Sequence, residues 1–222
     1  MFIGHFAVGF AGKKFAPRSS VATLLVAALF LDVLWPIFLL LGWEHVRIEP
    51  GNTRFTPFDL WDYPWSHSLL MSIAWATLFA FAYHLLTRYR EGAVVIWIAV
   101  LSHWVLDWIT HRPDMPLYPG PSPRFGLGLW NSISGTMVTE ISMLALAVWL
   151  YAHTTSARDR IGRYAFGGYV LLLLILYVGD GFSGPPNSTD EIIWPGIVGL
   201  LLLTIWAWWF DRHRVANPAP KE

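Results

Sequence analysis

The stretch SHWVLDWITH at residues 102–111 decides how the chain is interpreted. Within this apolar run, His103, Asp107 and His111 recur every four residues. Positions four and eight residues apart lie along one face of an α-helix, so the three polar side chains are expected to point the same way. Such a polar stripe is costly on an apolar helix unless something pairs with it. A metal ion is the simplest partner for two imidazoles that flank a carboxylate.

The composition places this helix in a membrane. Hydrophobic residues make up 55% of the 222-residue chain and charged residues only 14%, whereas soluble domains carry about 25% charged residues. A helix needs roughly 20 apolar residues to cross a bilayer. Segments that approach this length lie near residues 21–42, 67–87, 93–111, 129–151, 165–180 and 193–210. We therefore predict an all-α, polytopic membrane helical bundle with about six transmembrane helices plus a short N-terminal half-helix.

The same composition limits the classes of partner. Lysine and arginine balance aspartate and glutamate, so the net charge is zero and no nucleic-acid partner is predicted. The chain has no cysteine, which excludes disulfides and thiolate metal sites. The expected partners are the lipid bilayer and a small-molecule or lipid substrate, and the sequence identifies no protein partner. Residues 1–215 are predicted to form a single membrane-embedded domain, followed by a flexible C-terminal tail over residues 216–222.

The N-terminal apolar stretch, residues 1–12, is too short to cross a bilayer at 1.5 Å per residue. It is expected to form a re-entrant or interfacial half-helix, and it contains His5. In the first full span, Pro36 follows Asp32 by four residues and is expected to kink the helix just after that aspartate.

The distribution of lysine and arginine predicts the orientation of the spans, because these residues are retained in the cytoplasm. Basic residues concentrate in alternate connections and at both ends of the chain: Lys13, Lys14, Arg18, Arg88, Arg90, Arg158, Arg160, Arg163, Arg212, Arg214 and Lys221. We therefore expect a multi-pass protein with both termini in the cytoplasm.

Four ionisable residues lie inside the predicted spans: Asp32, His103, Asp107 and Glu140. Charges within a membrane cost a few kcal/mol each and normally face a cavity where they pair. Counting about 1.5 Å per residue from the cytoplasmic helix ends places Asp32, His103 and Glu140 near the midplane. By the same count Asp107 lies about one turn higher. His5, on the half-helix, reaches a depth close to that of Asp32, His103 and Glu140.

These side chains point to a divalent metal site with Zn²⁺ as the first candidate, one or two ions, and Mn²⁺ or Fe²⁺ as alternatives. The candidate metal ligands are His5, Asp32, His67, His103, Asp107 and His111. Asp107 is well placed to bridge two ions, and Glu140 is a candidate ligand or general base. Water bound to such a centre is deprotonated near neutral pH and attacks an ester or phosphoester. Candidates for hydrogen bonds to the ligands are Ser66, Ser68, Ser102 and Thr110.

Other interpretations remain open at this point. The isolated His84 and His153 are interpreted as packing or hydrogen-bonding residues, and His45 beside Glu44 as part of a solvated surface pair. The intramembrane cluster is also compatible with a metal-ion or proton transporter. A non-catalytic protein with a structural metal site is the third alternative, and its site would be closed by four protein ligands.

The order of these residues carries a resemblance to a known family. His5, Asp32, His67-Ser68, Ser102-His103-x-x-x-Asp107 and Thr110-His111 resemble the pattern of bacterial inner-membrane metal-dependent hydrolases, also described as LexA-binding and inner-membrane-associated. The resemblance extends to about residue 140 and implies an inner (cytoplasmic) membrane location and a metal-dependent hydrolase.

More remotely, the ordering is similar to the helical zinc-dependent phospholipase C and single-strand nuclease group. That similarity implies that one zinc is held by Asp32, His67, His103 and Asp107. It further implies that Asp107 bridges to a second ion near His5, and that a third site would draw on His111 and Glu140. Thr136 stands where that group has a further histidine, so one or two ions are implied rather than three. Because activity in this family is itself assigned by analogy, the substrate stays open.

Overall fold

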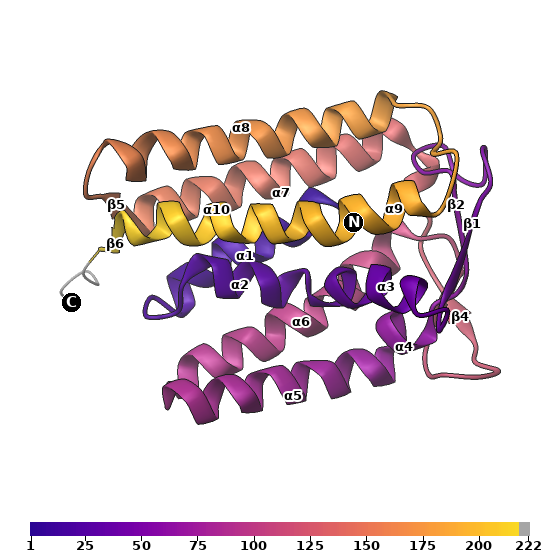
Figure 1. Cartoon of the computed structure of the whole chain (residues 1–222), viewed down its shortest axis with the longest axis horizontal. Coiled ribbons are helices and arrows are strands. Elements are labelled where there is room, and N and C mark those ends of the chain that lie inside the picture. The colour runs from indigo at the N-terminus through magenta and orange to yellow at the C-terminus, as the bar shows by residue number, and fades with distance from the viewer. Residues whose placement is uncertain (218–222) are drawn as a thin grey trace.

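The computed structural model describes residues 1–217 as a bundle of helices that run side by side (Figure 1). Its helices are α1 (Ile3–Phe15), α2 (Val21–Ala28), α3 (Phe30–Leu40), α4 (Pro64–His67), α5 (Leu69–Thr87), α6 (Arg90–Thr110), the 3₁₀ turn η1 (Leu129–Asn131), α7 (Ile133–Thr154), α8 (Arg160–Phe182), α9 (Asp190–Trp194), the π-helical turn η2 (Pro195–Gly199) and α10 (Leu200–Arg212). Its strands are β1 (His45–Ile48), β2 (Phe58–Asp62), β3 (Met115–Pro116), β4 (Arg124–Phe125), β5 (Thr155–Ala157) and β6 (Arg214–Ala216).

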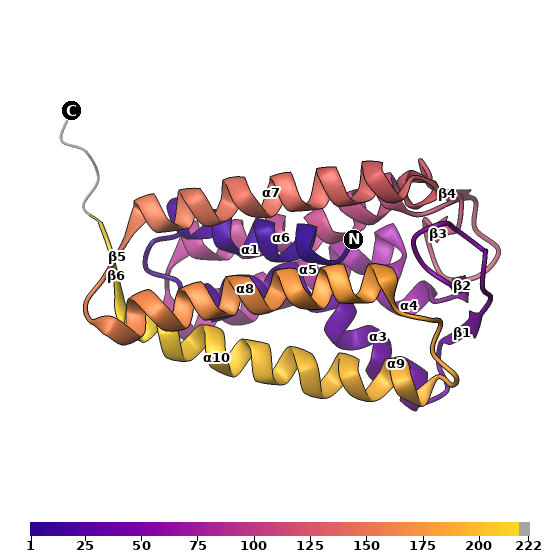
Figure 2. The same ribbon diagram turned by 90° about the horizontal axis from the view of Figure 1, so that it is seen from above.

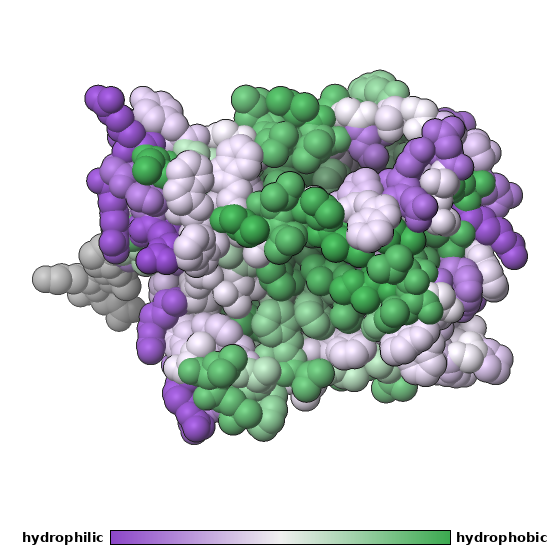
Figure 3. Space-filling model, viewed as in Figure 1, coloured by the Kyte–Doolittle hydropathy of each residue, from purple (hydrophilic) through white to green (hydrophobic). Residues whose placement is uncertain are grey.

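The predicted fold class is confirmed. Within the described residues, α5, α6, α7, α8 and the continuous segment from α9 to α10 are each long and apolar enough to cross a membrane. The pair α2 and α3 makes a sixth candidate span if the two helices are counted together. Figure 3 shows an apolar middle zone flanked by hydrophilic residues at both ends of the bundle, as expected for a membrane-spanning protein.

Side-chain caps explain where several helices begin. The side chains of Ser20, Ser68, Ser132 and Asp159 accept hydrogen bonds from backbone N–H groups in the first turns of α2, α5, α7 and α8. Each bond satisfies a backbone donor that has no partner within its helix, which stabilises a helix start by about 1 kcal/mol. The polar residues that punctuate the apolar sequence therefore define the helix boundaries.

The first span is bent by 58° between α2 and α3. The break lies at Leu29, three residues before Asp32, and was not expected from the sequence. Pro36 lies within α3, and a kink there stays a prediction. The break leaves the carbonyl oxygen of Ala28 free to accept a hydrogen bond from His103 of α6 at 2.9 Å. Insertion of a side chain into the hydrogen-bond ladder is a recognised cause of sharp helix bends.

Helix α1 is the predicted half-helix, and it lies inside the bundle. It packs against α7, α2, α6 and α8, and in Figure 2 it runs between α7 and α8. At 13 residues it is about 20 Å long, roughly two thirds of the hydrocarbon thickness. Near its C-terminal end, Lys13 is buried and contacts Asp211 of α10 at 3.4 Å. Asp211 also accepts hydrogen bonds from the backbone of Val21 and from the hydroxyl of Tyr151.

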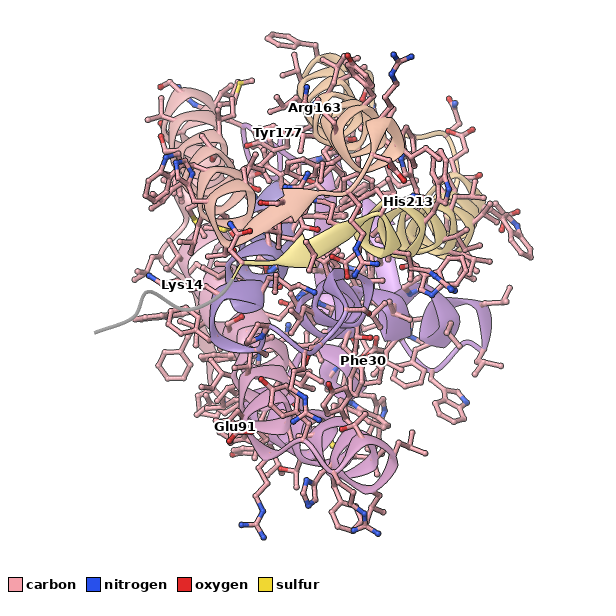
Figure 4. All side chains as sticks on the ribbon, turned by 90° about the vertical axis from the view of Figure 1, so that its left-hand side faces the viewer. Lys14, Phe30, Glu91, Arg163, Tyr177 and His213 are labelled. Carbon is pink, nitrogen blue, oxygen red and sulfur yellow. The ribbon has the colours of Figure 1, made fainter. Side chains whose placement is uncertain are left out.

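The two ends of the bundle differ. The loop end carries the antiparallel pairs β1–β2 and β3–β4. The basic end carries the pair β5–β6, which ties the C-terminal strand to the connection between α7 and α8. Figure 4 looks onto this basic end, where Lys14, Arg163 and His213 are labelled. Ala216 belongs to β6 and the backbone of Asn217 donates to Thr154, while the rest of the expected tail lies outside the described residues.

Candidate metal centre

Six candidate ligands meet at the loop-end half of the bundle. His5 comes from α1, Asp32 from the first turn of α3 and His67 from the last residue of α4. His103 and Asp107 come from α6, and His111 follows its last residue. Five of these side chains are at most 5% exposed, whereas Asp32 is 31% exposed. The centre therefore has a single accessible side, at Asp32.

One group of ligand atoms is spaced closely enough to hold a single ion. His103 Nε2 lies 3.1 Å from Asp107 Oδ2 and 3.5 Å from Asp32 Oδ1. His67 Nε2 lies 3.6 Å from Asp32 Oδ1 and 3.7 Å from Asp107 Oδ2. Four ligands at zinc bond lengths would lie about 3.4 Å from one another in a tetrahedron. Ligand atoms of Asp32, His67 and His103 thus lie within 4.8 Å of one another, close enough to hold one divalent ion, and Asp107 lies beside them.

The other carboxylate oxygen of Asp107 faces a second set of groups. Asp107 Oδ1 lies 3.1 Å from His5 Nε2 and 3.9 Å from His111 Nε2. The amine of Met1 also contacts this oxygen and lies 3.4 Å from the hydroxyl of Thr110. The imidazoles of His5 and His103 stack with their centroids 3.6 Å apart. A carboxylate that offers its two oxygens to different histidines has the arrangement expected of a bridging ligand.

Three of the histidines have their Nδ1 atoms occupied by other partners. His103 Nδ1 lies 2.9 Å from the carbonyl oxygen of Ala28, and His111 Nδ1 lies 3.0 Å from Asp114 Oδ1. His67 Nδ1 lies 2.6 Å from the hydroxyl of Ser66. Metal-binding histidines characteristically donate one ring N–H to an oxygen and bind the ion with the other nitrogen. In each case the remaining Nε2 faces Asp107.

Unpaired buried atoms support the same interpretation. Nine buried side-chain atoms of the described residues have no hydrogen-bond partner, and two of them, His103 Nε2 and His5 Nδ1, belong to candidate ligands. Buried polar atoms without partners are uncommon in folded proteins, and each one calls for an explanation such as an ion. A divalent cation bound by His103 Nε2 would remove one of these two exceptions. The donor set of imidazoles and carboxylates fits Zn²⁺.

Glu140 of α7 lies beside this centre and caps α1. Its Oε2 accepts hydrogen bonds from the backbone N–H groups of Phe2 at 2.8 Å and Gly4 at 3.1 Å. Helix α1 has no cap from its own N-cap side chain, so Glu140 satisfies donors that would otherwise be unpaired. This contact holds the helix that presents His5. The assignment of Glu140 as a ligand or general base stays a prediction.

Glu44 has a different role from the one expected. His45 pairs with Asp62 at 2.8 Å, whereas the adjacent Glu44 is buried and accepts two hydrogen bonds from Ser66. Burial raises the pKa of the Glu44 carboxyl, and the hydrogen bonds from Ser66 oppose that shift. The interpretation of Glu44 as part of a solvated surface pair is therefore wrong. The only sequence signal for its location is the polar pair Ser66-His67 at the start of an apolar span.

The four serines and threonines expected near the ligands divide into two groups. Ser66 contacts His67, and Thr110 lies against the amine of Met1. Ser68 instead caps α5, and Ser102 donates to the carbonyl of Ala99 within its own helix. Only the first two therefore touch the cluster.

A polar network at the loop end supports His111. Asp114 lies 3.0 Å from His111 Nδ1 and accepts a hydrogen bond from the hydroxyl of Tyr63 at 2.9 Å. Arg112 joins Asp114 to Asp59 of β2. Burial raises the pKa of Tyr63 well above its usual value, and the neighbouring Asp114 adds to that shift. Asp114 was missed from the sequence because it lies among the prolines of an extended loop.

Toward the basic end, the space next to the centre is filled by aromatic side chains. Phe6, Phe10 and Tyr169 are fully buried, and their ring centroids lie 6.0 to 6.5 Å apart. Phe10 continues this packing to Tyr151 at 5.3 Å. The described side chains on this side of α1 therefore form a packed core.

Comparison with known proteins addresses the family. No curated protein matches the chain, and no solved structure matches it. The model of a family described as YdjM inner membrane protein matches residues 1–183, which include every candidate ligand. The chain therefore belongs to the YdjM inner membrane protein family.

Proposed function

We propose that this protein is a membrane-embedded, metal-dependent hydrolase that acts on a phosphoester or lipid-derived ester. The observation that carries the proposal is the position of Asp107, whose two oxygens face four different histidines from α1, α4 and the C-terminal end of α6. Zn²⁺ is the preferred ion, with one or two ions bound. A divalent cation supplies hydrolytic chemistry by lowering the pKa of a bound water toward neutrality.

The two sets of ligands suggest different roles. Asp32, His67, His103 and Asp107 supply four protein atoms, which is the number that fills a tetrahedral site. The set around Asp107 Oδ1 offers fewer side chains, His5 and His111. An ion bound there would replace the amine of Met1 and would have positions for water and substrate. In a two-ion site, the Asp32 group (Asp32, His67, His103 and Asp107 Oδ2) would hold the first ion, and the His5 group (His5, His111 and Asp107 Oδ1) would hold the second, catalytic one.

The location of the centre favours a substrate that reaches it from the membrane or from the loop end. The centre is accessible at Asp32, which lies on a helix exposed to the apolar zone of the bundle. The same location argues against the transporter alternative, because packed aromatic rings separate the cluster from the basic end. A transport pathway needs polar groups that continue across the membrane.

The orientation follows from the distribution of charge. We infer that the basic end faces the cytoplasm, which places strand β6 there and the loop end on the opposite side of the inner membrane. The amine of Met1 lies instead inside the bundle, beside Asp107. Substrate would then meet the centre from the outer half of the bilayer or from the compartment beyond it.

The experiment that tests the proposal measures metal content and hydrolysis on the same purified protein. Detergent-solubilised protein is stripped with a chelator, reloaded with Zn²⁺ and assayed on bis(p-nitrophenyl) phosphate, p-nitrophenyl acetate and vesicles that contain phosphatidic acid. We expect metal-dependent release of product from a phosphoester, and its loss in Asp107→Asn. The exposed His153 provides the matched control, because His153→Ala removes an imidazole far from the centre.

Three outcomes separate the alternatives. Metal-dependent turnover that needs Asp107 supports the hydrolase. Tight binding of metal at four protein ligands without turnover of any substrate supports a structural site instead. The absence of bound metal in the wild-type protein overturns both.

A further inference from the structure

Glu44 and Ser66 form a chain of hydrogen bonds that ends at a candidate metal ligand. Ser66 donates its backbone N–H to Glu44 Oε1 at 2.7 Å and its hydroxyl to Glu44 Oε2 at 2.6 Å. The same hydroxyl lies 2.6 Å from His67 Nδ1. Glu44 is 1% exposed, Ser66 is fully buried, and His67 is 4% exposed. The chain thus runs from the outer connection after α3 to the centre through buried atoms only.

The donor and acceptor roles along this chain are fixed by chemistry. A hydroxyl carries one hydrogen, and a carboxylate only accepts hydrogen bonds. Because the Ser66 hydroxyl donates to Glu44, it must accept from His67, so the proton of the neutral imidazole lies on Nδ1. The lone pair of Nε2 then faces Asp32 and Asp107 at 3.6 and 3.7 Å. This is the tautomer that binds a cation in the Asp32 group.

The hydrogen bonds from Ser66 explain how the carboxylate of Glu44 can be buried. Removing a carboxylate from water costs several kcal/mol unless it is paired or hydrogen-bonded. Within the described residues, Glu44 makes no ion pair with lysine, arginine or histidine, and both of its oxygens are directed to Ser66. The neighbouring Glu49 on the same connection is exposed, as an acidic loop residue normally is. Burial of Glu44 is therefore specific to its contact with the Ser66-His67 pair.

We propose that Glu44, acting through Ser66, is a positioning residue that sets the tautomer and orientation of His67 for metal binding. This inference rests on the proposed function, because it assumes that His67 binds the ion. Partners of this kind raise metal affinity by roughly 10- to 100-fold at known sites.

The sharpest variant is Glu44→Gln. A glutamine side chain has an oxygen at one of the two positions and an NH₂ group at the other, so it cannot accept at both positions that Glu44 uses. If the oxygen keeps the backbone N–H, the NH₂ group donates to the hydroxyl. The hydroxyl hydrogen then loses its acceptor on residue 44 and can be donated to His67 Nδ1, which favours the tautomer with its proton on Nε2, where it opposes the cation. A nearly isosteric change is thus expected to weaken metal binding as much as Ser66→Ala does.

The experiment measures the Kd of Zn²⁺ by competition with a chromophoric chelator, and the visible spectrum of the Co²⁺-loaded protein as a signature of ligand geometry. We expect Glu44→Gln and Ser66→Ala to raise the Kd by roughly 10- to 100-fold and to alter the Co²⁺ spectrum. Glu49→Gln is the matched control for the charge. Ser68→Ala is the matched control for the serine, because Ser68 caps α5 without touching His67.

Thermal melting of each variant separates loss of positioning from loss of folding. Unchanged Kd and spectrum in a folded Glu44→Gln protein overturn the positioning role and leave the proposed function standing. If that variant does not fold, Ser66→Ala compared with Ser68→Ala decides the question by the same criteria. Absence of metal from the wild-type protein overturns the proposed function, and the positioning role with it.

Discussion

Replacing His103 with alanine tests the centre most directly, because this imidazole contacts both Asp32 and Asp107 and stacks on His5. His103→Ala removes a fully buried nitrogen that lies 3.1 Å from Asp107 and 3.5 Å from Asp32. It also removes the hydrogen bond to the carbonyl of Ala28 at the bend between α2 and α3. His5→Ala is the informative comparison, because His5 faces only the second oxygen of Asp107.

The size of the effect follows from the number of ligands. Zinc binding to structural four-ligand sites is worth about 10–16 kcal/mol, so an equal share for one ligand is about 2.5–4 kcal/mol. At 1.4 kcal/mol for each factor of ten, His103→Ala is expected to raise the Kd of the first ion by about 60- to 700-fold. His5→Ala is expected to leave the first ion bound and to lower the metal content by one equivalent if two ions bind.

The assay combines elemental analysis of the purified proteins with chelator competition at fixed pH. His153→Ala controls for the loss of an imidazole, since its side chain is exposed and bonds only to the backbone of its own helix. Equal metal content and Kd values within twofold of the wild type in His103→Ala would refute the arrangement described above. An equal loss of all metal in His5→Ala would refute the division into two ligand groups.

Three further predictions concern packing, charge and topology. In Gly9→Ala the added Cβ would lie 2.8 Å from the Cα of Leu25, so α1 must move. We expect the free energy of unfolding to fall by about 1–3 kcal/mol in thermal melts. Gly167→Ala is the control, because its added Cβ meets no atom within 4 Å. Asp211→Asn leaves the buried lysine of α1 without its charged partner, and a cost of about 3–5 kcal/mol is expected in chemical denaturation; a loss below 1 kcal/mol would contradict this pairing. Because the chain has no cysteine, Glu49→Cys and Arg158→Cys each introduce a single labelling site. On spheroplasts, a membrane-impermeant maleimide is expected to label the Glu49→Cys protein and not the Arg158→Cys protein. The reverse pattern of labelling would invert the orientation.

The sequence was sufficient to predict the spans and the identity of the side chains that converge. Long apolar segments indicate membrane-spanning helices. Burying ionisable residues within them costs enough free energy that they are expected to share a partner. The spacing of His103 and Asp107 on one helix face predicted their proximity, and the structure brings Asp32, His67 and His5 to the same place. The remote similarity to zinc phospholipases and the hydrolytic role stay predictions.

Other features depend on tertiary contacts that no local pattern reports. The bend of the first span lies at Leu29, next to Ala28, whose carbonyl oxygen accepts a hydrogen bond from His103 of another helix. The burial of Glu44 likewise depends on where Ser66 lies in space. The local sequence does not distinguish a buried acidic residue in a loop from a solvent-exposed one.

The interior position of α1 has a consequence for biogenesis. Ribosomes synthesise this helix before any segment that surrounds it, yet it is too short to enter the bilayer as an independent span. Its first backbone N–H groups find their acceptor on Glu140 of α7, so the helix can settle only after translation has passed residue 154. A nascent chain that ends before α7 already contains all six candidate ligands but lacks Glu140, which holds the start of the helix that presents His5. If the proposed centre binds metal, we therefore expect loading to follow the assembly of most of the bundle.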